Sequence, residues 1–344
     1  MKFPLPLYLL LLLIFLAACR PQTADRRPLK FKAYELNPIL GPGKPGEMDE
    51  IGAFSPSVLI HENVFYLFYS GLEKNGKISI GLATSEDGFH FEKYEKNPLL
   101  DPRENRFDSY HVSAAVVIRE DSIWVLYYNA AETALFSPGP YIGMATSREL
   151  TGPWKRTDEP VLVRGHRSEW DGGYIFPNSI LKMDDGSYRL YYTAGPGYPG
   201  IESQIGFATS RDGINWTKYN DPSTTDHPYA DSDPVKIKEQ WKNQVVQSAW
   251  SAYVSSSSAG YEIYYAKTFL DNNVEFGEIH HAFSQDGINF QKSQSKPAYG
   301  LKDDPLEGIN TLEFPSLVCQ DSLWFMYFDY GVEIGKIGLA VAIE

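Results

Sequence analysis

The sequence predicts an all-β protein: a five-bladed β-propeller of four-stranded antiparallel blades, in which an N-terminal strand closes the last blade. Three observations predict this fold. An aromatic strand pattern recurs five times, a second strand pattern follows each copy, and a segment near the N-terminus matches the outer part of the first copy. No helical periodicity competes with these patterns.

The first pattern consists of five short strings, at 65–69 (FYLFY), 124–128 (WVLYY), 188–192 (YRLYY), 261–265 (YEIYY) and 324–328 (WFMYF). They are rich in aromatic and apolar residues and flanked by turn residues, which is typical of strands. A second string follows each of them, at 80–85, 142–147, 205–210, 279–284 and 337–342. Three of these continue into an Asp-Gly turn and another aromatic residue, which indicates a hairpin.

One more apolar strand precedes each aromatic string, in the segments FSPSVLI, VSAAVVI, FPNSILK, AWSAYV and FPSLVC. A complete repeat therefore has four strands. A four-stranded repeat cannot bury both of its faces alone, so we expect the repeats to stack radially around a central channel.

The closing strand is predicted from a match between two segments. The fifth repeat has room for only three strands before Glu344, whereas 31–40 (FKAYELNPIL) matches the outer strand of the first repeat at 91–100 (FEKYEKNPLL). We expect residues 30–36 to supply the missing outer strand, which leaves no open edge.

The first residues predict export. An apolar run from Leu5 to Leu16 ends in small residues before Cys19, which is typical of a signal peptide. The string LAAC resembles the lipobox of bacterial lipoproteins, which implies that Cys19 is lipidated; the alternative is a plain signal peptide with a chance cysteine. We expect a signal peptide at 1–18, a lipidated tether at 19–28 and a single domain at 29–344. The expected location is the cell envelope, at the bacterial outer membrane or cell surface.

Charge and motifs exclude several functions. The formal net charge of −13 argues against nucleic acid as a partner, because no basic stripe is present to neutralise phosphates. The sequence has no glycine-rich phosphate loop, no HExxH or paired Cys/His spacing and no GxSxG elbow. We therefore expect no metal and no cofactor.

The loops that lead into the innermost strands converge on one face of a propeller, so a site is expected there. Four of the five loops carry an acid just after a hydrophobic residue: Asp49, Asp108, Asp171 and Glu307; the fifth has Lys242. Two interpretations remain open. A repeated acid can hold a turn through backbone N–H groups, or at least two of these acids can face the channel as interacting carboxylates.

Glu313 departs from the repeat. Counted back from the proline position, its counterparts are Phe54, Val112, Ile175 and Ser248, so it is the first candidate for a catalytic acid. The candidate ligand-binding residues near the channel are His111, Trp170, Tyr174, Trp241, Trp250 and Arg167. Aromatic rings there can stack on sugar faces, although each ring taken alone is also explained by packing.

The repeated strings and the segment FYLFYSG–IGLATSEDGFHFEKYEKNPLL resemble the five-bladed propeller glycoside hydrolases, which include families 32, 43 and 130. This resemblance covers 30–344 and implies a carbohydrate substrate. Family 43 places an acid in an E-x-P string, which occurs here as Glu313-Phe314-Pro315, but in the last blade rather than a middle one. The position of its base aspartate is Ser55 here, and the NDPNG string of family 32 is absent.

The expected function is therefore that of a monomeric glycoside hydrolase with two carboxylates spaced as in inverting enzymes, Glu313 as acid and Asp49 or Asp108 as base. Two alternatives remain open. A non-catalytic glycan-binding lipoprotein needs no facing carboxylates. A phosphorylase needs a cationic cluster for phosphate, which could come from His111, Arg103, Arg106, Arg167 and Lys242.

Overall fold

The computed structural model describes residues 28–134, 138–197, 202–239, 244–245, 249–271, 274–302, 304, 306, 309–330 and 335–343. All regular elements in these residues are β-strands, and nearly all strand pairs are antiparallel. The prediction of an all-β fold is confirmed. The described residues contain no helix of the length and apolarity that crossing a membrane requires.

The strands form five successive antiparallel runs, each of which we call a unit. Unit 1 contains β2 (Gly52–His61), β3 (Val64–Leu72), β4 (Ile78–Ser85) and β5 (Glu92–Lys93). Unit 2 contains β6 (His111–Glu120), β7 (Ile123–Ala131), β8 (Tyr141–Ser147) and β9 (Lys155–Arg156), with β10 (Leu162–Val163) beside β8. Unit 3 contains β11 (Tyr174–Lys182), β12 (Tyr188–Gly195), β13 (Gln204–Ser210) and β14 (Thr217–Lys218).

Unit 4 contains β17 (Trp250–Ser257), β18 (Gly260–Asp271), β19 (Val274–Ser284) and β20 (Asn289–Lys292). Two further strands extend it, β15 (Lys236–Glu239), which runs parallel to β20, and β16 (Gln244–Val245). Unit 5 contains β21 (Glu313–Gln320), β22 (Leu323–Asp329), β23 (Ile337–Ile343) and the N-terminal β1 (Lys32–Ala33).

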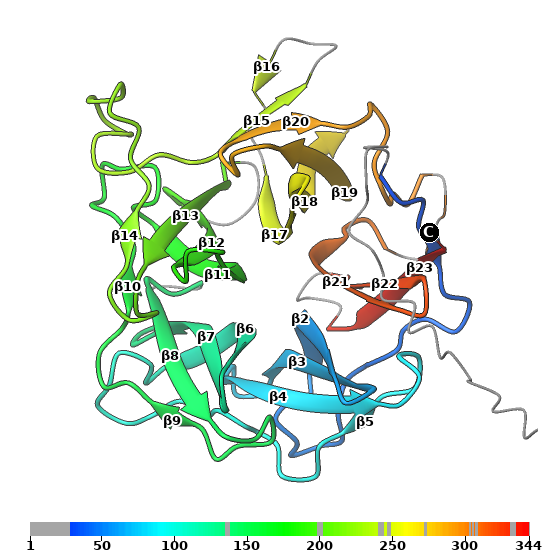
Figure 1. Cartoon of the computed structure of the whole chain (residues 1–344). Coiled ribbons are helices and arrows are strands. Elements are labelled where there is room, and N and C mark those ends of the chain that lie inside the picture. Colours follow the sequence, from blue (N-terminus) through cyan, green and yellow to red (C-terminus); the bar gives the residue numbers. More distant parts are fainter. Residues whose placement is uncertain are drawn as a thin grey trace, which may run out of the picture.

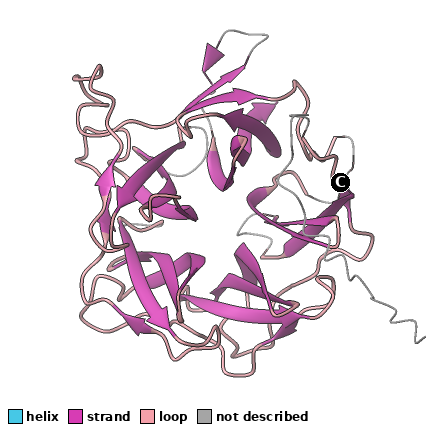
Figure 2. Ribbon diagram, viewed as in Figure 1, coloured by secondary structure: helices cyan, strands magenta, loops and turns pink. Residues whose placement is uncertain are grey.

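The units are arranged around a common centre in a propeller-like fold (Figure 1). Hydrogen bonds join their strands into four sheets, because one parallel pair, Ile78 with His111, links units 1 and 2. The coloured ribbon of the described residues consists of strands and loops (Figure 2). The innermost strands contact one another in sequence: β2 with β6, β6 with β11, β11 with β17, β17 with β21, and β21 with β2.

The repeated glycine of the second string has a packing cause. Tyr128 lies directly opposite Gly143 on the neighbouring strand, and a Cβ added to Gly143 would lie 2.4 Å from the Tyr128 Cζ. Tyr69 covers Gly81 in the same way. The tyrosine ring on the second strand of these units therefore leaves no room for a side chain at the glycine that lies opposite it on the third strand.

The Asp-Gly turns connect neighbouring units. The Tyr127 hydroxyl of unit 2 donates to the Gly213 carbonyl of unit 3 at 2.9 Å, and Tyr191 donates to Gly287 of unit 4 at the same distance. Tyr327 of unit 5 donates to Gly88 of unit 1 at 2.7 Å. The contact between the last and first units thus has the form of the contacts between consecutive units.

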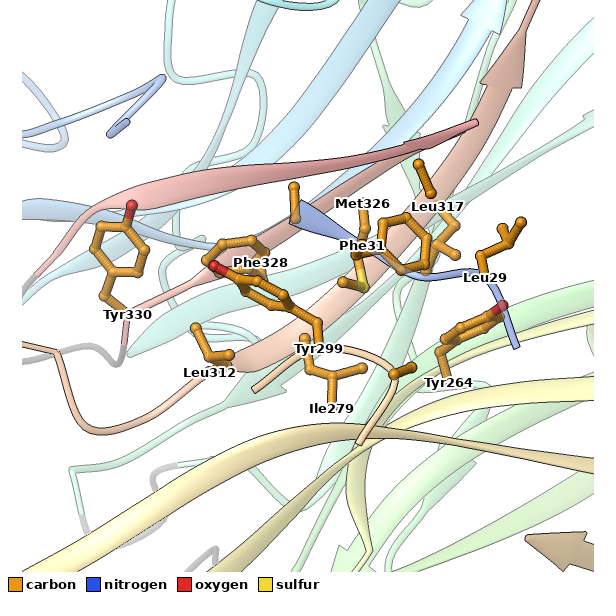
Figure 3. Close-up of a cluster of buried hydrophobic side chains, with 13 residues drawn as sticks. Leu29, Phe31, Tyr264, Ile279, Tyr299, Leu312, Leu317, Met326, Phe328 and Tyr330 are labelled. Atoms are coloured by element: carbon orange, nitrogen blue, oxygen red, sulfur yellow. The ribbon is translucent and has the colours of Figure 1, made fainter. Parts of the chain in front are cut away.

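The N-terminal segment pairs with unit 5, as its match to 91–100 predicted. Lys32 pairs with Val341 and Ala33 with Ala340, although the strand is shorter than the predicted 30–36. Leu29 and Phe31 are buried among Tyr264 of unit 4 and Met326 of unit 5 (Figure 3). Burial of these side chains fixes the segment between the two units.

Candidate functional site

The predicted acids of the loops lie in a repeated cluster. Asp49 is buried, accepts the Tyr69 hydroxyl at 2.9 Å and pairs with the Lys93 ammonium at 2.6 Å. Tyr69 belongs to the second strand of unit 1 and Lys93 to its fourth strand. We call this arrangement of an acid, a second-strand tyrosine and a fourth-strand cation the acid–tyrosine cluster.

The next unit repeats this cluster. The Asp108 carboxylate accepts the Tyr128 hydroxyl at 2.9 Å and pairs with Arg156 at 3.0 Å and with Arg103 Nε at 3.0 Å. Burial and the Asp108 charge raise the pKa of Tyr128, so its hydroxyl stays protonated as a donor.

Units 3 and 4 contain variants. Asp171 pairs with Lys218 at 2.5 Å beside Tyr192. In unit 4, Glu239 of β15 takes the place of the loop acid and pairs with Lys267 and Lys292. The geometry of all four clusters supports the structural interpretation of the repeated acids, because each carboxylate is held by donors of its own unit. Glu307 and Lys242 lie outside the described residues.

A β-bulge sets the register at the innermost strands and corrects the sequence alignment of Glu313. Four of the five bulges contain a residue with positive φ, namely Ser55, Ala114, Ser251 and Phe314, and the bulge of β11 lies at Asn178. Glu313 therefore corresponds to Phe54, Ser113, Phe176 and Trp250. The counterparts Val112 and Ile175 were wrong by one residue, because counting from proline ignores the bulge. The counterpart Ser248, itself outside the described residues, is replaced by Trp250, which pairs with Ala266 as Glu313 pairs with Asp329.

Glu313 remains the single carboxylate at this position among these five residues, and it lies directly opposite a second acid. Glu313 on β21 pairs with Asp329 on β22. Directly opposed residues project from the same face of a sheet with Cβ atoms about 4.5–5.5 Å apart. Glu313 is half-buried and Asp329 is buried.

The backbone of unit 1 holds Asp329 in place. The Ser55 N–H donates to Asp329 Oδ2 at 2.7 Å. In other pairs of neighbouring units a hydroxyl group accepts the corresponding backbone N–H: Ser70 accepts from the Ala114 N–H and Thr193 from the Ser251 N–H. A carboxylate is therefore not needed for the contact between units.

Sequence reasoning missed Asp329, although a signal was present. The residue after the aromatic string is Ser70, Asn129, Thr193, Ala266 and Asp329 in the five repeats. Asp329 is the acid in this series, as Glu313 is in the other.

His111 lies on the innermost strand of unit 2 and is almost fully buried, with 1% of its surface exposed. Its Nε2 lies 3.1 Å from Asn129 Oδ1, an atom that only accepts, so Nε2 carries the proton. Burial lowers the pKa of His111, which favours the neutral ring. The Nδ1 lone pair has no partner within the described structure.

Aromatic residues of units 3 to 5 form one cluster at the same height along the innermost strands as Glu313. Trp250 packs edge-on against Phe314 at 5.7 Å between ring centroids, and Phe314 lies 5.3 Å from Phe176. Tyr174 stacks on Phe176 at 6.0 Å. Tyr174 and Trp250, two of the predicted ligand-binding aromatics, therefore lie together.

Other predicted residues lie elsewhere. Trp170 is buried, stacks on Tyr192 and donates its Nε1 hydrogen to Ser232, which is the packing role that the sequence also allowed. Arg167 is exposed on the loop before β11. Trp241 and Cys19 lie outside the described residues.

The channel is narrow below this level. Residues of all five innermost strands, including Ser55, Ala114, Pro177, Ala252 and Phe314, line a cavity of about 20 Å³. Such a volume holds about one water molecule. We call the end of the channel where Glu313 lies the channel mouth. The described residues contain no group of three or more His, Cys, Asp and Glu side chains arranged to hold a metal ion.

Comparison with known proteins identifies relatives by sequence. No family model matches the chain. An uncharacterized protein of Mycobacterium tuberculosis is 24% identical over 293 residues, which are 83% of this chain and 89% of that protein. A 1,2-beta-oligomannan phosphorylase of Thermoanaerobacter is 35% identical over 71 residues, 19% of this chain and 24% of the phosphorylase.

Solved structures of glycoside hydrolases have the same fold. One belongs to work on the GH130 family of mannoside phosphorylases, which contains glycoside hydrolases that target β-1,2 mannosidic linkages in Candida mannan. It has a TM-score of 0.70 and 18% identity over 93% of this chain and 98% of its own. A glycosyl hydrolase of Bacteroides ovatus has a TM-score of 0.69 and 18% identity over 93% of this chain and 95% of its own. The resemblance to propeller glycoside hydrolases is thus confirmed at the level of the fold.

Proposed function

We propose that this protein is a glycoside hydrolase whose site is the channel mouth, with Glu313 and Asp329 as its two carboxylates. The observation that carries the proposal is their direct opposition on β21 and β22. Glu313, half-buried, is the acid that protonates the leaving oxygen. Asp329, oriented by the Ser55 N–H, is the second carboxylate.

The spacing of this pair favours a retaining reaction. Directly opposed Cβ atoms lie about 4.5–5.5 Å apart, so two carboxyl groups that extend side by side from them reach the separation of roughly 5–5.5 Å that retaining enzymes use. Asp49 and Asp108, the bases expected from the sequence, are engaged in acid–tyrosine clusters. We therefore replace the inverting scheme by a retaining one.

The other walls of the mouth suit a sugar. Trp250 and Tyr174 are buried in the aromatic cluster, and Phe314, which packs against this cluster, is half-buried and supplies the aromatic surface on which a sugar C–H face can stack. Glu313, which is half-buried, supplies a polar group beside this ring. A carbohydrate presents both apolar faces and hydroxyl groups, so this combination supports a glycan as the substrate.

A phosphorylase is the second candidate, favoured by the 71-residue match to the oligomannan phosphorylase. Several of the described cationic side chains argue against a phosphorylase, because they are already paired with carboxylates. Arg103 and Arg156 pair with Asp108, Arg106 pairs with Asp158, and the ring of His111 is neutral. Two acids at the mouth also repel a phosphate dianion.

We further propose that the five units form a closed five-bladed propeller and that residues 29–344 make up this single domain. The sequential contacts of the innermost strands, the Tyr327–Gly88 hydrogen bond and the β1–β23 pairing support closure.

The LAAC string supports lipidation of Cys19 and a location at the outer membrane or cell surface. We expect a monomer.

The experiment that tests the function is a glycan screen with the protein lacking residues 1–18, with and without inorganic phosphate, beginning with β-mannans. We expect sugar release without phosphate. Glu313→Gln should lower turnover by about 10²-fold or more, because it removes a general acid but keeps the shape. Cleavage that requires phosphate would favour the phosphorylase. Glycan binding that Glu313→Gln leaves intact, with no cleavage by the unmodified protein, would favour a binding protein.

A further inference from the structure

The direction of the N-terminal strand places the start of the domain far from the channel mouth. Asp329, opposite Glu313, also pairs with Ile337 at the start of β23, so these residues mark the mouth end of unit 5. β1 is antiparallel to β23: Lys32 lies beside Val341, whereas Leu40, later in the chain, lies beside Ile337. The chain therefore runs toward the mouth, and Pro28 lies at the opposite end.

The height of the unit separates the two ends. β21 runs from Glu313 to Gln320, at the turn into β22. A strand rises about 3.3 Å per residue, so the far end lies roughly 23 Å from the carboxylate pair. We call this opposite surface, formed by the β2–β3, β6–β7, β11–β12, β17–β18 and β21–β22 turns and by the Asp-Gly turns, the far end.

The tether at 19–28 is short compared with the height of the unit. Nine peptide units separate Cys19 from Pro28, which gives a reach of about 30 Å at full extension. β1 lies on the outer edge of unit 5, and Leu29 and Phe31 are buried next to it, so the tether starts at a fixed point. Reaching the mouth plane along the outside would use most of its length.

We infer that the lipid anchor holds the domain with its far end toward the membrane and its channel mouth away from it. The inference rests on the proposed lipidation of Cys19. It extends the proposed function, because the mouth then opens to long glycan chains outside the membrane surface.

The far end itself is acidic. Its turns carry the exposed acids Glu62, Glu86, Asp87, Asp121, Glu149, Asp184, Asp185, Asp212, Asp286 and Asp321, against the basic residues Arg119, Arg148, Lys182 and Arg211. Hydrogen bonds from the Asn215 backbone and side chain lower the pKa of Asp212, which keeps it ionised. Such a surface offers no basic patch for anionic lipid headgroups, so the orientation follows from the anchor point and the short tether and not from binding of the surface to lipid.

The test compares two exposed turn residues of unit 1. Lys74 lies in the β3–β4 turn at the mouth end, and Glu86 follows β4 at the far end. An unnatural amino acid at either position carries a donor fluorophore in the full chain, which is purified from bacterial membranes and placed in vesicles with acceptor-labelled phosphatidylglycerol. Mass spectrometry of the N-terminal peptide first establishes whether Cys19 carries lipid.

We expect greater energy transfer from position 86 than from position 74. Lipid on Cys19 with equal transfer, or more from position 74, would overturn the orientation and leave the location intact. A Cys19 without lipid would overturn the location and the orientation together. Cys19→Ser should fail to float with the same vesicles; flotation of this variant would show that the surface itself binds lipid and would contradict the inference. Glycan cleavage, measured separately, reports on the hydrolase alone.

Discussion

At the scale of single residues, the same amino acid type has two roles in this protein. Asp108 is surrounded by a tyrosine hydroxyl and two arginines of its own unit, and its charge is balanced there. Asp329 faces another carboxylate and accepts a backbone N–H from the next unit. The partners, and not the residue type, distinguish a structural acid from a candidate for chemistry.

This distinction gives a test at Asp108. Asp108→Asn should lower the free energy of unfolding by roughly 2–3 kcal/mol, because Arg103 and Arg156 lose their charged acceptor in a buried site. Activity per folded molecule should stay unchanged. Urea denaturation and glycan assays well below the melting temperature measure the two effects. Loss of turnover with unchanged stability would instead make Asp108 the base that the sequence suggested.

Histidine titration gives a second test at this scale. Burial lowers the pKa of His111 and of His280, so both are neutral in the folded protein, whereas they titrate near 6.5 when unfolded. Below that pH the unfolded chain binds more protons. Their contribution to stability is therefore complete above pH 6.5 and is lost as the pH falls toward the folded pKa, by up to about 1.4 kcal/mol per pH unit for each histidine.

His111→Asn should make the free energy of unfolding less steep in pH between about 6.5 and 5 than in the unmodified protein. Chemical denaturation at several pH values measures this slope. The comparison cancels the carboxylates that both proteins share. An unchanged slope would mean that His111 is protonated in the folded state.

At the scale of strands, the sequence was sufficient to predict which segments are strands, but not the register in which neighbouring strands pair. Aromatic strings and Asp-Gly turns identify the strands, because these features depend on neighbours in the chain. The bulge beside Glu313 depends on contacts between units, such as the Phe314 N–H donating to Ser251 Oγ. A residue count cannot detect such a contact, and the alignment of Glu313 was therefore shifted.

The tyrosine–glycine pairs provide a prediction for a strand. Gly143→Ala should destabilise the protein by about 1–3 kcal/mol, because its Cβ would overlap the Tyr128 ring. Gly41→Ala is a matched control, since no atom lies within 4 Å of a Cβ there. Thermal or urea unfolding compares the two. An equal cost for both substitutions would refute the packing explanation of the repeat.

At the scale of the whole molecule, the sequence predicted the repeat and the pairing of its first and last parts. The match of 31–40 to 91–100 found the partner of β23, because the two segments perform the same task in different units. The candidate site was only partly predictable. The sequence singled out Glu313, Tyr174 and Trp250 as candidates, whereas the pairing of Glu313 with Asp329 needed the strand register.

Closure of the ring is tested at the contact between units 5 and 1. Tyr327→Phe should cost about 1 kcal/mol, as should Tyr127→Phe and Tyr191→Phe, because each removes one hydrogen bond to a turn carbonyl. Deleting 29–40 should lower the melting temperature strongly. A Tyr327→Phe variant as stable as the unmodified protein, while the other two lose stability, would argue for an open ring.

The central claim is that Glu313 and Asp329 act together on a glycan. The most direct measurement is proton NMR of the first sugar released from a cleaved glycan, which reports its anomeric configuration, combined with the turnover of Asp329→Ser. Serine keeps the contact between units, as Ser70 does, and removes only the carboxylate. We predict retention of configuration and a loss of turnover by about 10²-fold or more, with normal folding. Inversion of configuration, or an Asp329→Ser variant that cleaves as fast as the unmodified protein, would contradict the account.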